Sequence, residues 1–412
     1  MNILFLSELF YPNGSGAELA TYLYAKLLSN AGFSVTVVTN RFSGEPEFSS
    51  SEGFAVYRLS LFENMKDVKY SILKRVDTLL SVSMRKFLRW ADVVYIPRYW
   101  FSAIPLAKTL GKPVITHLHD YIPICPMANR YDVVAGGFCE RQNHCSLNCI
   151  VANEKRSRGL AKVVGSVFLN ATAWHCLRKF IGLSDFIICV SRAQRDIIVQ
   201  NMPSLAEKVR VIYNPMPSLS PLEIQGDDFG YFGGLSHPKG FHVLLKALHC
   251  LKRKGWTPVV VNATKFPNMK EHLAHFLANL GVAVYGRLNS AEYGRVYRKN
   301  KAVIVPSIWQ EPFGYVVAEA ILRGRVVVAS SIGGIPELAD GCRGVFLIDP
   351  NDPFQLAETI EHVASLSREE ASNLGAHNIE VFSSRFENGK ILDDFSELLN
   401  SVIVTKNVRV GI

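Results

Sequence analysis

Short runs of consecutive apolar residues alternate with longer amphipathic segments along most of the chain. The runs are rich in β-branched residues, which is typical of strands buried on both faces of a sheet. Residues 17–32 carry apolar side chains at helical spacing and end in Gly32, a common helix stop. Strand, helix and strand in series predict a parallel sheet covered by helices on both faces. In the first half of the chain, the expected strands are residues 2–7, 34–40, 92–97, 113–120 and 186–191.

The same alternation begins again after an interruption. Residues 203–226 hold several prolines and show no apolar periodicity, which indicates a boundary between domains. We therefore predict an α/β protein with two doubly wound domains, at residues 1–205 and 206–384. The last part of the chain has a helical pattern, with a possible strand at residues 401–405. In the second domain, the expected strands are residues 230–235, 258–263, 282–288, 302–307, 326–331 and 344–349.

Composition supports two large cores. The 412 residues are 48% hydrophobic and 20% charged, which excludes a disordered chain and exceeds the size of one compact core. No apolar stretch reaches the roughly 18 residues that span a bilayer. The chain begins with a short apolar run and an acid at Glu8, without a basic leader, so we expect a first strand and not a signal peptide. These features predict a cytoplasmic protein.

The basic charge is concentrated in the first half of the chain. The net charge is +9, and residues 1–200 hold 23 of the 45 Lys and Arg but only 15 of the 36 Asp and Glu. Anionic lipid head groups or acidic glycans would suit a basic domain, although a merely basic surface explains the charge equally well. No basic stretch is interleaved with stacking aromatic residues, so we expect no nucleic-acid partner. Residues 66–90 form a basic amphipathic segment that could contact an anionic membrane, but packing against its own domain is the commoner use of this pattern.

Ligands of doubly wound folds bind at the carboxyl ends of the strands, so the residues after each strand are candidates. Gly14 and Gly16 flank Ser15 just before an expected helix. This turn could bind an anion at the helix N-terminus or could be a plain tight turn. Lys239 and Gly240 lie at the start of another expected helix, where the lysine could reach a phosphate or stay solvated.

Two carboxylates give the sharpest pattern. Glu311 follows a strand and precedes Pro312, which is tolerated in the first turn of a helix. Glu319 lies inside the apolar helix that follows, where it could bind ligand hydroxyls or simply face solvent. His119 and Asp120 end another buried strand, and a histidine beside an acid at this edge is a candidate for catalysis or substrate binding.

Four cysteines, Cys125, Cys139, Cys145 and Cys149, fall within one polar segment, with His144 beside the third. Clustered thiols in a cytoplasmic protein indicate a metal site more than disulfides. The spacing lacks the Cys-x2-Cys pairs of common zinc sites, so both a structural zinc and unligated thiols stay open. The remaining cysteines are scattered and are expected in the cores.

Together these motifs resemble the retaining glycosyltransferases of family GT4, which have the GT-B fold. The resemblance covers nearly the whole chain, and its most specific part is the pair of glutamates separated by seven residues around Pro-Phe-Gly. The motifs occur in the family's order at residues 10–18, 116–120, 184–191, 233–240, 284–288, 305–320 and 333–338.

The resemblance implies two Rossmann-like domains facing across a cleft. The first would bind the acceptor and be completed by a C-terminal helix at about residues 385–412, and the second would bind the nucleotide sugar. The implied activity is metal-independent, retaining transfer of a sugar from a nucleoside diphosphate sugar to a glycan, a lipid-linked or a small-molecule acceptor. Such transfer would serve polysaccharide or glycolipid biosynthesis, and a lipid-linked acceptor would bring the protein to the inner face of the membrane.

The resemblance also assigns roles to donor-binding residues. Glu311, with the backbone of Phe313 and Gly314, would hold the hydroxyls of the transferred sugar, and Glu319 would bind the ribose. The two acids would thus bind the two sugars of one ligand. Glu311 would act as a binding and positioning group and not as a nucleophile of the kind found in retaining glycosidases.

The diphosphate would be neutralised by Lys239 and the backbone of Gly16, with Arg287 and Leu288 near the base. Cations and N–H dipoles at this place stabilise the charge that grows on the leaving group. The chain departs from the family at Gly234, where an arginine is common, so one diphosphate cation is missing unless Arg287 or His237 replaces it.

His119 would lie beside the reacting sugar, and Asp120 and Glu18 are candidates on the acceptor side. Two other classes of function stay open beside transfer. One is a nucleotide-sugar epimerase of the same fold, and the other is a scaffold protein that binds nucleotide sugars without turning them over.

Overall fold

The computed structural model describes residues 1–60, 82–98, 100–140, 147–157, 160–255, 260–265 and 271–410. The chain forms two compact units. One unit contains Met1–Met216 and Glu387–Ile412, and the other contains Pro217–Phe386. The boundary at Met216 lies inside the proline-containing segment 203–226 and after the predicted position at residue 205.

A mostly parallel sheet forms the centre of the first unit. Within the described residues its eight strands run in the order β10-β9-β6-β5-β1-β2-β4-β3, and only β3 pairs in antiparallel fashion, with β4. A short pair, β7 with β8, lies apart from this sheet. The strands are β1 (Asn2–Leu6), β2 (Ser34–Asn40), β3 (Phe48–Ser51), β4 (Phe54–Leu59), β5 (Val93–Ile96), β6 (Val114–Leu118), β7 (Tyr131–Asp132), β8 (Gly137–Phe138), β9 (Phe186–Cys189) and β10 (Val209–Val211).

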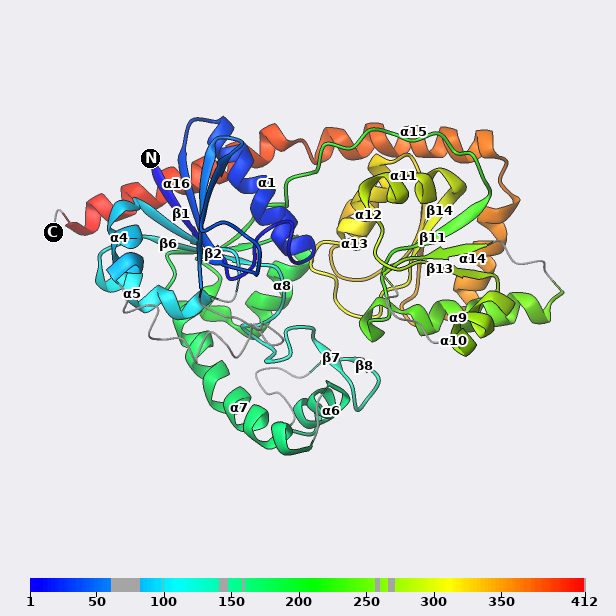
Figure 1. Cartoon of the computed structure of the whole chain (residues 1–412), viewed down its shortest axis with the longest axis horizontal. Coiled ribbons are helices and arrows are strands. Elements are labelled where there is room, and N and C mark those ends of the chain that lie inside the picture. The colour runs from blue at the N-terminus through cyan, green and yellow to red at the C-terminus, as the bar shows by residue number, and fades with distance from the viewer. Residues whose placement is uncertain are drawn as a thin grey trace. The chain divides into compact units, whose positions relative to one another are not determined.

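Helices cover both faces of this sheet (Figure 1). Successive residues of a strand point to opposite faces, so Leu4 and Leu6 join one core cluster while Ile3 and Phe5 join the other. Both faces are therefore buried, which explains the continuous apolar runs in the sequence. The helices of this unit are α1 (Gly16–Asn30), α4 (Val82–Trp90), α5 (Ala103–Thr109), α6 (Leu147–Ser157), α7 (Leu160–Gly182), α8 (Arg192–Asn201) and α16 (Asn388–Val410), with single turns η1 (Trp100–Ser102) and η2 (Pro203–Leu205).

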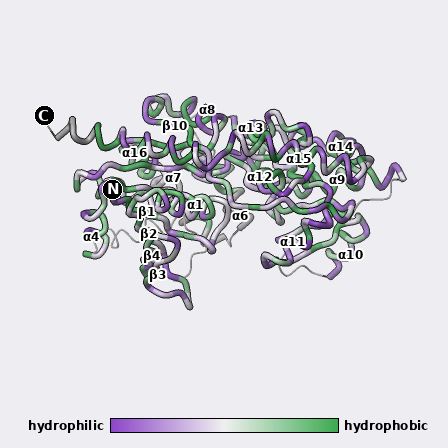
Figure 2. The backbone as a smooth tube through the Cα atoms, turned by 90° about the horizontal axis from the view of Figure 1, so that it is seen from above, coloured by the Kyte–Doolittle hydropathy of each residue, from purple (hydrophilic) through white to green (hydrophobic). Residues whose placement is uncertain are grey.

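The last helix, α16, belongs to the first unit. Phe395 of this helix lies against Tyr24 of α1, with ring centroids 5.1 Å apart, and against Tyr95 of β5, at 5.4 Å. Hydrophobic and hydrophilic residues alternate along α16 (Figure 2), as expected of a helix with one buried and one exposed face. The possible strand at residues 401–405 is wrong, because Val402 is buried on this helix and packing overrides the β-propensity of the segment.

The second unit has a six-stranded parallel sheet in the order β13-β12-β11-β14-β15-β16, counted over its described residues. This is the order 3-2-1-4-5-6 of dinucleotide-binding Rossmann folds. The strands are β11 (Asp228–Tyr231), β12 (Val261–Ala263), β13 (Val282–Val284), β14 (Asn300–Val305), β15 (Val326–Ser330) and β16 (Val345–Ile348). The helices are η3 (His237–Lys239), α9 (Phe241–Arg253), α10 (Glu271–Asn279), α11 (Ser290–Lys299), α12 (Tyr315–Leu322), α13 (Ile335–Ala339), α14 (Pro353–Ser365) and α15 (Arg368–Arg385).

The basic segment at residues 66–90 is described only from residue 82 onward. There α4 buries Met84 and Leu88 in the core of the first unit and exposes Val82 and Trp90. This part therefore packs one face against its own domain. Over the parts of the chain that the structure describes, no helix combines the length and the apolar character needed to cross a bilayer.

Candidate functional site

The candidate donor site lies at the carboxyl edge of the sheet in the second unit. Strand order reverses between β11 and β14, and ligands of doubly wound folds bind at such switch points. The chain leaves β11 toward η3 and Lys239, and it leaves β14 toward Ser307 and Glu311. The two most specific sequence motifs therefore follow the two strands that flank the switch point.

A short ion pair joins these two loops. Lys239 Nζ lies 2.5 Å from Glu311 Oε1, and Ser307 Oγ donates a hydrogen bond of 2.8 Å to the same oxygen. Lys239 Nζ also lies 5.0 Å from the ring centroid of Trp309, in cation–π contact. Glu311 is buried, whereas Lys239 keeps a third of its side chain exposed. The structure thus brings together two residues that the sequence placed in one site.

Glycines let these loops approach closely. A Cβ at Gly240 would lie 1.7 Å from the Pro306 carbonyl oxygen, and a Cβ at Gly333 would lie 2.1 Å from the Glu311 carbonyl oxygen. Both glycines have positive φ, so larger residues would be strained as well as obstructed. Gly334 N–H donates to the Glu311 carbonyl at 2.8 Å. These contacts fix the backbone that carries Glu311.

The loop after Glu311 ends in a glycine with left-handed backbone conformation, which caps the next helix. Phe313 is buried, and Gly314 adopts φ 102° as the N-cap of α12. Glu319 lies on α12, where burial raises the pKa of its carboxyl while the positive charges of Lys265 and Arg323 lower it. Glu319 is half-buried on this helix, so its side chain is neither enclosed in the core nor fully open to solvent.

Four further residues of the site follow the neighbouring strands β11, β12 and β13. Gly234, after β11, is buried with φ 67°. Arg287 and Leu288 follow β13, with Arg287 exposed and Leu288 half-buried. Lys265, after β12, is a residue that sequence reasoning missed, because a single lysine behind a three-residue strand forms no motif.

The first unit has its own polar cluster at a switch point, between β1 and β5. Arg98 Nε lies 3.2 Å from Glu8 Oε1 and 3.1 Å from Glu18 Oε1. Burial raises the pKa of Glu8 to about 7, although Arg98 lowers it. Sequence reasoning proposed Glu18 but missed Glu8 and Arg98 as site residues, because no spacing connects them along the chain.

Glu18 also closes the turn at the start of α1. Its Oε2 accepts a 2.6 Å hydrogen bond from Ser15 N–H, which completes a capping box. A Cβ at Gly14 would lie 2.4 Å from the Glu18 side chain, so the glycine is needed for this contact. The negative charge that a helix N-terminus favours is thus already supplied by Glu18. A diphosphate contact at Gly16, the first residue of α1, stays a prediction.

His119 follows β6 at the same edge of the first sheet. Its ring stacks on His117 at 4.3 Å, and His117 Nδ1 lies 2.5 Å from the Tyr95 hydroxyl. Burial and the charge of Arg98 lower the pKa of His119 to about 3, so this imidazole is neutral near pH 7. Asp120 instead accepts a 2.9 Å hydrogen bond from Ile122 N–H and caps the following turn.

The cysteine cluster is described in part. Cys125 and Cys149 are buried, Cys139 is half-buried, and Cys145 lies outside the described residues. Cys149 Sγ lies 3.8 Å from the Tyr131 carbonyl oxygen. Among the described side chains, no three His, Cys, Asp or Glu residues are grouped as metal ligands would be. The zinc site stays a prediction.

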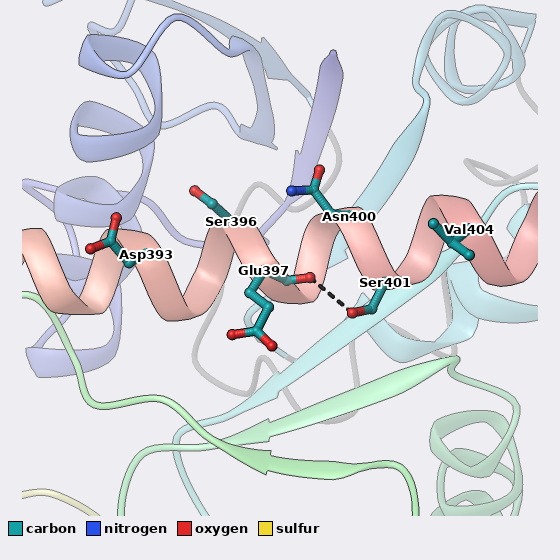
Figure 3. Close-up of a pocket in the computed structure, with 6 residues that line it drawn as sticks. All are labelled: Asp393, Ser396, Glu397, Asn400, Ser401 and Val404. Carbon is teal, nitrogen blue, oxygen red and sulfur yellow. Dashed lines mark hydrogen bonds between the residues drawn. The ribbon is translucent and has the colours of Figure 1, made fainter.

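A hollow lies on the surface of α16 in the first unit. All the side chains that line it come from this one helix, and Figure 3 shows them along its exposed face. Ser401 Oγ donates to the Glu397 carbonyl within the helix at 2.9 Å. None of the predicted site residues lines this hollow, which is formed by Asp393, Ser396, Glu397, Asn400, Ser401 and Val404.

Comparisons with known proteins match both units. The family model Glycosyltransferase Family 4 matches residues 14–217, and the model Glycosyl transferases group 1 matches residues 226–365. An uncharacterised glycosyltransferase of Methanocaldococcus jannaschii is 25% identical over 342 residues, which cover 75% of this chain and 78% of that protein.

Solved structures with the same fold cover nearly the whole chain. Sucrose-phosphate synthase from Thermosynechococcus elongatus superposes with a TM-score of 0.71 at 16% identity, covering 98% of this chain and 99% of that one. HepE of Anabaena, solved in complex with UDP-glucose, superposes with a TM-score of 0.64 at 21% identity, covering 97% and 100%. The fold is therefore GT-B, with two Rossmann-like domains, and the chain belongs to the group 1 glycosyltransferases.

Proposed function

We propose that the second unit binds a nucleoside diphosphate sugar and that the enzyme transfers the sugar to an acceptor hydroxyl with retention of configuration and without a metal ion. The observation that carries the proposal is the buried Glu311 carboxylate, held by Lys239 and Ser307 at the switch point of the sheet. A fixed carboxylate is suited to accept hydrogen bonds from sugar hydroxyls, and the adjacent lysine is suited to a phosphoryl oxygen.

The donor class is supported by the charges around this edge. Lys239, Lys265 and Arg287 follow three neighbouring strands, and Glu319 lies on the helix after Glu311. Cations therefore accompany two carboxylates, as a ligand with both phosphates and hydroxyls requires. The structurally similar HepE was solved with UDP-glucose, which favours a nucleotide sugar as the donor here.

In the proposed reaction, the bond between the anomeric carbon and the diphosphate oxygen breaks, and its electron pair stays on the diphosphate. The acceptor oxygen forms the new bond to the anomeric carbon on the same face, and its proton passes to the departing phosphoryl oxygen. Lys239 and the nearby N–H groups stabilise the charge that grows on the diphosphate. Glu311 holds the sugar in place, so no residue of the chain forms a covalent bond to it.

We place the acceptor in the first unit. Glu8 Oε2 and His119 Nε2 are buried and have no hydrogen-bond partner within the described part of the chain. Buried polar atoms without partners are costly, and ligand hydroxyls would satisfy them. This polar cluster favours a hydroxyl-rich acceptor, which we take to be a glycan or a lipid-linked sugar made in the cytoplasm.

A lipid-linked acceptor would bring the protein to the inner face of the membrane. Co-sedimentation with vesicles of neutral and of anionic lipid tests this contact. Binding to the anionic vesicles alone supports it, and equal sedimentation with both counts against it.

The test of the activity is incubation with a panel of nucleoside diphosphate sugars and analysis of all products. Release of the free nucleoside diphosphate together with a glycosylated acceptor supports transfer, and the anomeric configuration of the product reports retention. An isomerised donor would identify an epimerase instead. Saturable binding without turnover would identify a non-catalytic binding protein.

A further inference from the structure

The loops after β11 and β12 meet at Gly234 and Lys265. A Cβ at Gly234 would lie 3.3 Å from the Lys265 carbonyl oxygen and 3.4 Å from Lys265 Cβ. The Lys265 side chain thus begins directly beside the position where the sequence lacks a cation. Thr264 N–H donates to the Tyr231 carbonyl at 3.0 Å, which ties this loop to the end of β11.

The backbone of Lys265 has an unusual conformation. Its φ is 67°, in the left-handed region that residues other than glycine rarely adopt. Its N–H donates to the Gly286 carbonyl at 3.1 Å, so the loop is also tied to the residues after β13. A strained residue held from both sides is a common feature of ligand sites, because the surrounding structure stabilises a conformation with a local cost.

Two other cations act electrostatically on Lys265, which is an exposed residue. Partial desolvation lowers the pKa of Lys265, the charge of Glu319 raises it, and the charges of Lys239 and Arg287 lower it further. Like charges that converge without a bound anion repel one another. A diphosphate placed among them would convert this repulsion into attraction.

We infer that Lys265 is the second cation for the donor diphosphate and replaces the arginine that is absent at Gly234. The inference rests on the proposed donor site. For this second cation, the sequence alone had offered Arg287 or His237. His237 stacks on His242 with ring centroids 4.3 Å apart and an interplanar angle of 9°, so its ring is engaged with α9.

The experiment measures binding of UDP, GDP and ADP, and of the corresponding nucleosides, to the whole protein by calorimetry. The diphosphate that the wild type binds most tightly then serves for three variants. Lys265→Met removes the charge and keeps the aliphatic length, Lys265→Arg restores the charge, and Lys246→Met is the control at an exposed lysine of α9.

We expect Lys265→Met to weaken diphosphate binding by roughly 10- to 100-fold, the usual effect of losing a charge-assisted hydrogen bond. Binding of the nucleoside should be unchanged, Lys265→Arg should recover most of the affinity, and Lys246→Met should match the wild type. The dependence of diphosphate binding on salt should also become shallower in Lys265→Met.

Two results would overturn the inference while leaving the donor site intact. Wild-type affinity of Lys265→Met for the diphosphate would show that the lysine contributes nothing. An equal loss of affinity for the diphosphate and for the nucleoside would show that Lys265 does not act on the diphosphate. Its effect would then pass only through Glu319, the residue assigned to the ribose. If the wild type binds no nucleoside diphosphate, both the proposed function and this inference fail.

Discussion

Lys239 Nζ lies 2.5 Å from Glu311 Oε1, although 72 positions separate the two residues in the chain. The contact joins the loops after β11 and β14, the two strands between which the order of the sheet reverses. Ser307 donates to the same oxygen, so both interactions involve Oε1. These two contacts hold the carboxylate in a fixed position, which suits it to accept hydrogen bonds from a ligand.

Glu311→Gln should reduce turnover by about 100-fold, because a carboxylate that positions the sugar is replaced by an amide of equal size. The fold should be kept, since Lys239 is partly exposed and can be solvated. Steady-state kinetics and circular dichroism measure the two effects. Glu358→Gln, at an exposed glutamate of the same unit, is the matched control. Turnover of Glu311→Gln at the wild-type rate would remove Glu311 from the site.

Glu319→Gln should reduce the preference for ribose in the nucleotide. A carboxylate accepts hydrogen bonds from both ribose hydroxyls, whereas an amide accepts with one atom only. We expect the wild type to bind the ribonucleoside diphosphate at least roughly 10-fold more tightly than its 2′,3′-dideoxy analogue, and the variant to bind both about equally. Competition binding measures this ratio. An unchanged ratio in the variant would place Glu319 away from the ribose.

The strands were predictable because parallel strands buried on both faces must be continuously apolar. Three other strands of the first sheet were missed: β3, whose four residues include three serines, β4, which is not continuously buried, and β10, which has only three residues. Residues 401–405 were predicted as a possible strand because they are β-branched, yet α16 forms there through burial of Val402. Local patterns therefore fail where tertiary packing decides the element.

The candidate site was predictable only where its residues lie in one motif. Glu311 and Glu319 share a strand–loop–helix segment, so their spacing indicated a common ligand. Arg98 contacts Glu8 and Glu18 across about 80 to 90 positions of sequence, and Lys265 adjoins Gly234 through a loop contact. Such pairs arise from strand order, which a single sequence does not reveal.

Glu8 should make the stability of the first unit depend on pH. Its pKa is raised from 4.5 to about 7, so the folded protein holds a proton there that the unfolded chain releases. Between pH 4.5 and pH 7 the carboxyl ionises in the unfolded chain but stays protonated in the fold, so the free energy of unfolding falls as the pH rises through this interval. Relative to the wild type, Glu8→Gln should gain stability over this interval, by up to about 3 kcal/mol.

Thermal unfolding of both proteins between pH 4.5 and pH 7.5 measures this difference. The control is Glu52→Gln, because hydrogen bonds from Tyr22 and Lys26 lower the pKa of Glu52. Because a lowered pKa changes stability only at pH values below the ordinary pKa of the carboxyl, that variant should differ from the wild type by a nearly constant amount over this interval. A constant difference between Glu8→Gln and the wild type would contradict the raised pKa of Glu8.

Removal of metal ions should leave turnover unchanged, because Lys239, Lys265 and Arg287 supply the positive charge that a divalent ion would otherwise provide. Turnover is measured after treatment with EDTA and again after addition of magnesium or manganese. Loss of turnover in EDTA that is restored by magnesium would contradict metal-independent transfer.

Elemental analysis of the dialysed protein tests the cysteine cluster separately, since a structural zinc would be retained at one equivalent.

A crystal structure of the protein with a non-transferable nucleoside diphosphate sugar would test the central claim most directly. We predict the donor at the carboxyl edge of β11 and β14, with sugar hydroxyls on Glu311, ribose on Glu319 and the diphosphate on Lys239. A nucleotide bound at another place, or a Glu311 carboxylate without contact to the sugar, would contradict it.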